Sequence, residues 1–171
     1  MFGRNFFVSI FLIVSVFIIS ASVAAQDLPK EIISLKGIDG VGVEIEEIDP
    51  DAQKDGLNGD ELASTVTESL GGAGIKVLSK AELNGSVGAP SLFVNINTIK
   101  HSGGVYSFTV NIGLEQVVFL ARNLDIKLEA PTWSIIGTGA SLPEDLDSDV
   151  GKYVKILVDS FIEQYKLANT K

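Results

Sequence analysis

The feature that most constrains the fold is a long apolar stripe in the last part of the chain. Residues 150–165 carry apolar side chains at intervals of three and four positions, the spacing of one helix face. The stripe consists of Val150, Tyr153, Val154, Leu157, Val158, Phe161, Ile162 and Tyr165. Ser141 and Glu144 have capping-box spacing and Pro143 fits a first turn, so we expect the helix to begin there. Such a helix needs a second layer to cover its apolar face.

The preceding segments can supply that layer as a sheet. Residues 41–45, 92–96 and 105–115 alternate apolar and polar side chains, the pattern of half-buried strands. The sequence KHSGG joins the second of these to the third as a tight hairpin loop. Residues 75–79 and 126–139 are predicted as two further strands, and Pro131 within the latter implies a bulge or an edge position.

A second helix is predicted near Asn58, where Asn58 and Glu61 have capping-box spacing, and glycines at 71–74 end it. The order is then strand, helix, four strands, helix. It predicts an α+β fold with a mostly antiparallel or mixed sheet of about five strands and two helices on one face. Residues 41–171 form this single domain, preceded by a lead-in at 26–40.

Residues 1–25 have the layout of a secretory signal peptide. Arg4 is their only charge, an apolar run follows, and small residues lead to Ala25 and Gln26, between which we expect cleavage. The alternative is an uncleaved membrane anchor, because an apolar run approaching about 20 residues can span a bilayer. We expect a periplasmic or secreted protein that has no membrane contact after cleavage.

The composition narrows the choice of partners. The chain has 13 basic and 22 acidic residues, a formal net charge of −9, and Arg122 is its only arginine beyond Arg4. Nucleic acids and anionic lipid surfaces require clustered positive charge, so neither is an expected partner. Cysteine is absent, which excludes disulfides and thiolate metal sites.

The order of elements resembles the amino-terminal domain of TolB, the periplasmic protein of the Tol–Pal system, and related envelope accessory proteins. The stretches that carry the resemblance are LASTVTESLGGAGIKVLSKAEL, SLFVNINTI with GVYSFTVNIGL, and VGKYVKILVDSFIEQY. The resemblance implies a small periplasmic α+β domain with a non-enzymatic role. It transfers no binding residue, and neither the propeller of TolB nor the lipidated cysteine of envelope lipoproteins is found in this sequence.

Candidate catalytic and metal motifs are incomplete. Residues 51–62 approach a calcium-binding loop, but Gln53 and Leu62 occupy positions where acidic ligands belong, so a solvated turn is the better interpretation. His101 is the only histidine, lies in the predicted hairpin loop, and lacks the neighbours of a zinc site or a catalytic triad. We therefore expect no enzyme activity and no cofactor.

The stretch that begins at residue 105 changes character at Gly113. Eighteen extended residues would reach about 60 Å, so the strand must bend, and Gly113 is the natural place. Residues 117–120 are apolar on both faces. Either the last helix covers the second face or a partner does, and we expect the helix.

Two functions fit this pattern. The first is an exported non-enzymatic envelope protein acting through contacts with another envelope protein. Its contact surface would be the polar strand face of Ser107, Thr109 and Asn111, or an edge near Trp133, where strand addition is plausible. Trp133 is alternatively a buried core residue. The second function is a carrier that holds a small apolar ligand between the sheet and the last helix.

Overall fold

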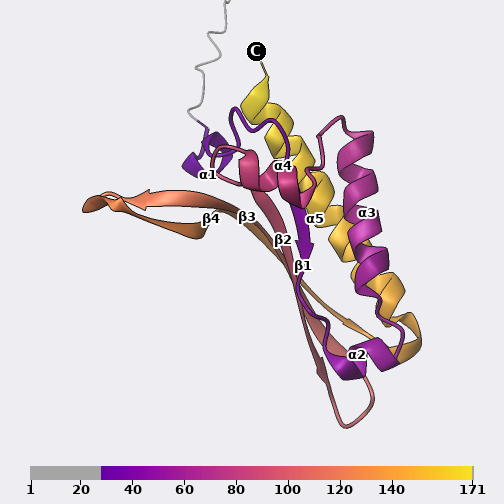
Figure 1. The fold of residues 1–171 in the computed structure, drawn as a ribbon. Helices are drawn as coiled ribbons and strands as arrows, with labels where there is room; N and C mark the ends of the chain where they lie inside the picture. The colour runs from indigo at the N-terminus through magenta and orange to yellow at the C-terminus, as the bar shows by residue number, and fades with distance from the viewer. Residues whose placement is uncertain (1–27, 171) are drawn as a thin grey trace, which may run out of the picture.

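A computed structural model describes residues 28–170 and shows a twisted four-stranded sheet with the two long helices on one face (Figure 1). The strands are β1 (Gly42–Ile45), β2 (Ser91–Lys100), β3 (Tyr106–Leu120) and β4 (Asn123–Ser141), and they lie in the order β1-β2-β3-β4. The pair β1–β2 is parallel and the other pairs are antiparallel. The predicted α+β class and mixed sheet are confirmed.

The number of strands differs from the prediction. Residues 75–79 contribute only one parallel bridge, between Val77 and Val41, instead of a fifth strand. The chain turns immediately afterwards into α4 (Lys80–Gly85), where a capping box of Ser79 and Glu82 starts the helix. This helix was not predicted from the sequence, although the S-x-x-E pattern from Ser79 to Glu82 is a helix-start signal.

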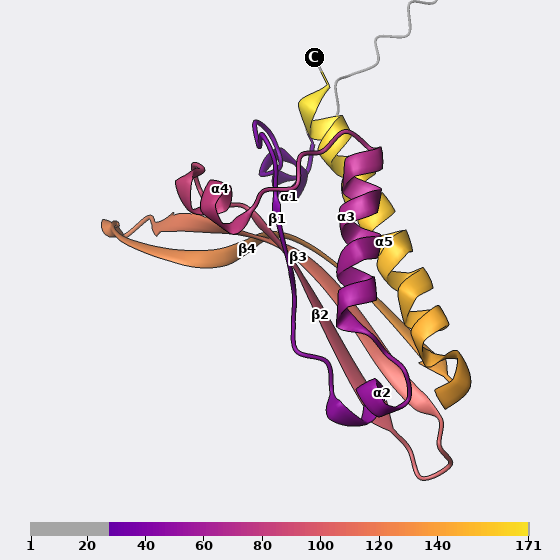
Figure 2. The ribbon, with the colours of Figure 1, turned by 45° about the vertical axis from the view of Figure 1, so that its right-hand side comes forward.

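Two long helices, α3 (Gly59–Gly72) and α5 (Leu146–Asn169), lie side by side on the same face of the sheet (Figures 1 and 2). The start of α3 is as predicted, because the Asn58 side chain caps the helix by accepting from the Asp60 amide. The predicted capping box of Ser141 and Glu144 is wrong. A 3-10 turn, Pro143–Asp145, precedes α5, and the Ser141 hydroxyl donates to Asp149 instead.

Two other short helices complete the described chain. α1 (Lys30–Ile33) lies in the predicted lead-in, and α2 (Pro50–Lys54) lies in the predicted loop before α3. The part of the lead-in that the structure describes packs on the domain, since Leu35 is fully buried and its carbonyl accepts from Asn169 at the end of α5. The predicted signal peptide and its cleavage point at Ala25 and Gln26 lie outside the described residues.

The core lies between the sheet and the two long helices. The row of β3 residues that faces the helices is buried throughout: Tyr106, Phe108, Val110, Ile112 and Leu114. Aromatic rings join the layers, because Phe108 meets Tyr153 edge-on at 5.1 Å and Trp133 meets Phe161 at the same centroid distance. The predicted apolar stripe of α5 provides most of the opposite wall.

Candidate contact surface

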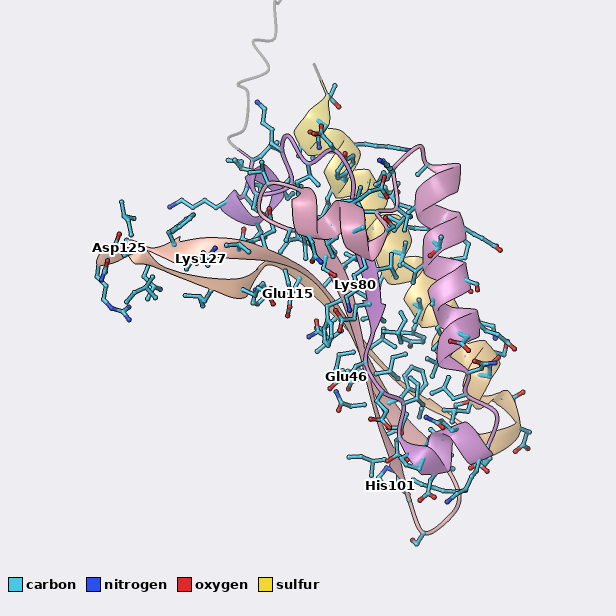
Figure 3. All side chains as sticks on the ribbon, viewed as in Figure 1. Glu46, Lys80, His101, Glu115, Asp125 and Lys127 are labelled. Carbon is cyan, nitrogen blue, oxygen red and sulfur yellow. The ribbon has the colours of Figure 1, made fainter. Side chains whose placement is uncertain are left out.

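The sheet narrows from four strands to two beyond Glu115. The last residue of β3 that pairs with β2 is Glu115, opposite Ser91. From there β3 and β4 continue alone as a two-stranded ribbon, residues 116–130, which we call the arm. The arm swings away from α3 and α5, with Asp125 at its far end and Lys127 between Asp125 and the base (Figures 1 and 3).

A bulge at the base of the arm accompanies the bend. Leu114 pairs with Trp133, but the next residue, Glu115, pairs with Pro131, so Thr132 has no residue opposite it. An extra residue on one strand bends that strand and increases its twist. The sequence predicted a bulge or an edge position at Pro131, and both are observed, since β4 is the outermost strand.

Hydrogen bonds to the N-terminal region hold the bulge in place. The Thr132 hydroxyl accepts from the Gln116 amide at 2.7 Å, and the Thr132 carbonyl accepts from the Ser34 hydroxyl at 3.1 Å. Gln116 also donates to the Ser34 carbonyl at 3.3 Å. The hydroxyl and the carbonyl of Thr132 are therefore both hydrogen-bonded, and the direction of the arm is tied to the residues just after α1.

The arm exposes large apolar side chains on both faces. Phe119 is 59% exposed and Leu124 is 69% exposed, and Ile126 and Leu128 are exposed as well. The pairing places Val118 and Leu128 on one face and Phe119 and Lys127 on the other. We had expected α5 to cover residues 117–120, and this is wrong, because the bend carries the arm away from that helix.

The edges of the arm are free as well. β4 is the outermost strand, and the last backbone bond of β3 to the β2 side within residues 28–170 runs from the Val117 amide to the Gly88 carbonyl at 2.8 Å. Past that point both strands of the ribbon have an outer edge with no neighbouring strand from the described part of the chain. Unpaired strand edges are templates for pairing with another chain.

The predicted polar residues lie where the sequence placed them, on the face of β3 that the helices do not cover. Ser107 and Asn111 are exposed and Thr109 is half-buried. The Ser107 hydroxyl lies 2.8 Å from Nε2 of His101, which is itself exposed in the hairpin loop. No contact in the structure tests these residues as a binding surface, so that role stays a prediction.

Trp133 is a core residue, so the prediction of an exposed anchor at this position is wrong. Its side chain is 3% exposed, packs against Phe161, and donates from the indole nitrogen to Gln164 at 2.9 Å. The alternation of side chains along β4 directs Trp133 toward α5. The sequence alone did not reveal which face of the sheet α5 covers, so it left the burial of Trp133 open.

A cluster of charged and polar groups lies at the end of the sheet opposite the arm. Asp55, just after α2, accepts from Nζ of Lys100 and from the Tyr106 hydroxyl, each at 2.6 Å. These hydrogen bonds hold the pKa of the Asp55 carboxyl below its usual value, and they raise the pKa of Tyr106. The cluster ties α2 to the β2–β3 hairpin and works as a structural clamp.

Residues 28–170 contain no group of three His, Asp or Glu side chains placed to hold a metal ion. None of the helices in that range combines the length and apolarity needed to cross a bilayer.

The space between the sheet and α5 is filled by side chains. The residues that fill it are Trp133, Val150, Val154, Leu157, Val158 and Phe161. Three hollows in the described residues lie beside β1, at the His101 end of the sheet and on the arm, and none of the three is lined by α5. No observation in this part of the chain favours the carrier alternative.

Comparisons with known proteins leave the family open. No model of a known protein family matches the sequence, and no curated protein matches it. Among solved structures, the chain is similar to a minor lipoprotein from Acinetobacter baumannii, at 12% identity and a TM-score of 0.30, over 74% of this chain and 91% of that one. A TM-score this low carries no argument, and no link to TolB is shown, so that resemblance remains a prediction.

Proposed function

We propose that this chain is an exported accessory protein of the cell envelope that acts by binding another envelope protein, with the arm as its binding surface. The observation that carries the proposal is the combination of exposed apolar side chains and free strand edges on residues 116–130. An isolated two-stranded hairpin is at best marginally stable in water, so such a ribbon gains from a partner.

The gain from covering the arm is large enough to support binding. Four of its large side chains are exposed, and burying each would contribute on the order of 1–2 kcal/mol, because each is already partly covered. Exposed large apolar side chains grouped on one short segment commonly mark an interaction site. Export and the envelope location rest on the pattern of residues 1–25 and remain part of the proposal.

A matched pair of variants tests the proposal. Phe119 on the arm and Ile156 on α5 are both 59% exposed, so Phe119→Asp and Ile156→Asp add the same charge at equal exposure. The wild-type chain and both variants are each used to capture proteins from the envelope fraction of the host after mild crosslinking, read by mass spectrometry.

We expect one recurrent partner, captured in near-equal amounts by the wild type and Ile156→Asp and strongly reduced with Phe119→Asp. Equal capture by both variants would exclude the arm as the contact. Recovery of the chain alone in all three samples would contradict the proposed function.

A further inference from the structure

The other outermost strand, β1, also has a free edge. The Gly42 amide donates to the Pro90 carbonyl and the Glu46 amide donates to the Val94 carbonyl, each at 2.9 Å. Backbone groups alternate in direction along a strand, so Val43, Ile45 and Glu47 point their amides and carbonyls away from β2.

Only the first residue of this edge is paired within the described chain. Val41 donates to the Lys76 carbonyl at 2.9 Å and accepts from the Leu78 amide at 2.8 Å. The covering segment then turns into α4 at Ser79. From Val43 onward the edge has no neighbouring strand among residues 28–170, although residues 76–78 show that this edge accepts an extended segment.

A groove runs beside the free part of the edge. It has a volume of about 640 Å³ and lies between β1, the end of α2 and the start of α3. Apolar side chains line it from all three sides: Val43, Ile45, Ile48, Leu57 and Ala63. Val43 and Ile45 are only half-buried, because no further strand covers them.

The charges that line the groove are all negative, whereas Lys76 and Lys80 lie beside the start of the edge, where residues 76–78 pair with Val41. Glu46, Glu47 and Asp60 border the groove, and no lysine or arginine does. Glu44 lies on the face of β1 opposite the two long helices, the face on which Leu83 of α4 packs at Gly42, and Figure 3 shows Glu46 at the carboxyl end of that strand. None of these four carboxylates forms an ion pair with another described residue.

We propose that this edge binds an extended peptide segment of a partner protein by strand addition, and that the segment alternates apolar and basic residues. Side chains opposite Val43 and Ile45 would point toward the groove, where Val43, Ile45 and Ala63 offer apolar contacts among polar neighbours. Those opposite Glu44 and Glu46 would point to the other face of the sheet, beyond α4, where the carboxylates favour lysine or arginine. This site is separate from the arm and does not depend on the function proposed for it.

The test uses the full chain and a labelled, end-blocked octapeptide of alternating lysine and valine, with fluorescence anisotropy as the readout. We expect saturable binding with amide chemical-shift changes at Val43, Ile45 and Glu47. The same peptide N-methylated at alternate residues along one edge keeps its charge but loses its strand-pairing donors, and we expect its affinity to fall at least tenfold. An alternating glutamate–valine peptide should not bind.

Protein variants separate strand addition from general attraction to an acidic chain. Glu44→Lys with Glu46→Lys should raise the dissociation constant at least tenfold. Glu68→Lys with Glu163→Lys, at exposed helix positions away from the groove, should leave it within about twofold after correction for net charge. Equal weakening by the two pairs, unchanged binding of the N-methylated peptide, or no binding at all would overturn the proposal.

Discussion

The helix-covered half of the sheet and the arm are built from the same two strands, yet they bury their apolar side chains to opposite extents. In the covered half, β3 residues 106–114 present an apolar row that is almost fully buried. In the arm, Phe119 on β3 and Leu128 on β4 are equally apolar and exposed. Both halves carry apolar side chains that favour burial. The difference in their exposure therefore arises from which other elements cover each half.

Two changes at Glu115 explain the difference. β2 begins there, at Ser91, so β3 has no neighbour on that side beyond Glu115, and the bulge at Thr132 turns the ribbon away from α5. A sequence pattern reports which side chains favour burial but does not reveal which of them the chain itself buries. The arm therefore combines core-like composition with surface exposure, the property on which its proposed binding role rests.

The largest predicted effect compares one substitution in each half. Phe161→Ala removes a fully buried ring that packs against Trp133, and we expect it to lower the free energy of unfolding by about 3–5 kcal/mol. Phe119→Ala on the arm should change it by less than about 0.5 kcal/mol. Urea unfolding followed by circular dichroism measures both. Equal losses of unfolding free energy would show that Phe119 is buried in solution and would contradict the contrast between the two halves.

The next effect concerns close packing under the helices. A Cβ atom at Gly139 would lie 2.5 Å from Cζ of Phe108, whose ring is held against Tyr153. We expect Gly139→Ala to destabilise the fold by about 1–3 kcal/mol. Gly113→Ala is the control, because the nearest atom to its added carbon is 3.6 Å away. If the thermal midpoints of the two variants match, the covered half is packed more loosely than described.

A smaller effect tests the link between the two halves. Thr132→Ala removes the hydroxyl that accepts from Gln116 and donates to the Leu114 carbonyl, a loss of about 1 kcal/mol. We expect hydrogen exchange to speed up several-fold in the arm and to stay unchanged in residues 106–114. Thr109→Ala, on the helix-free face of the covered half, is the control. Faster exchange spread evenly over both halves would show that the hydrogen bonds of Thr132 do not hold the arm specifically.

The smallest effect is a pH dependence at the end of the sheet far from the arm. Hydrogen bonds from Lys100 and Tyr106 lower the pKa of Asp55 in the folded state below its ordinary value of 3.8. The stability from this carboxylate is present above that value and is lost as the pH falls through the lower folded pKa. Asp55→Asn should therefore lose less unfolding free energy than the wild type between about pH 5 and about pH 3. Parallel losses would show that the clamp does not form.

Local sequence signals predicted much of the covered half. Alternation placed Ser107, Thr109 and Asn111 on one face of β3, and the capping pattern placed the start of α3 at Asn58. The apolar spacing of residues 150–165 predicted α5. In each case the residues within one element carry the whole signal, so no knowledge of distant neighbours was required.

The errors concern relations between elements. Residues 75–79 have strand-like composition, but the chain leaves the sheet at Ser79, so only the bridge at Val77 forms. Trp133 was open between core and surface because its exposure depends on which face α5 covers. Predicting the arm would have required knowing that the pairing of β2 with β3 stops at Glu115. The sequence of residues 117–120 carries no information about that distant strand.

The measurement that tests the central claim most directly is site-specific photo-crosslinking in the native host, with a photoreactive residue at position 119 in one variant and at position 156 in the other. The two sites are equally exposed, one on the arm and one on α5. We predict a discrete crosslinked product of constant mass from position 119 and none from position 156. No product from 119, or the same products from both positions, would contradict the proposal that the arm is the binding surface.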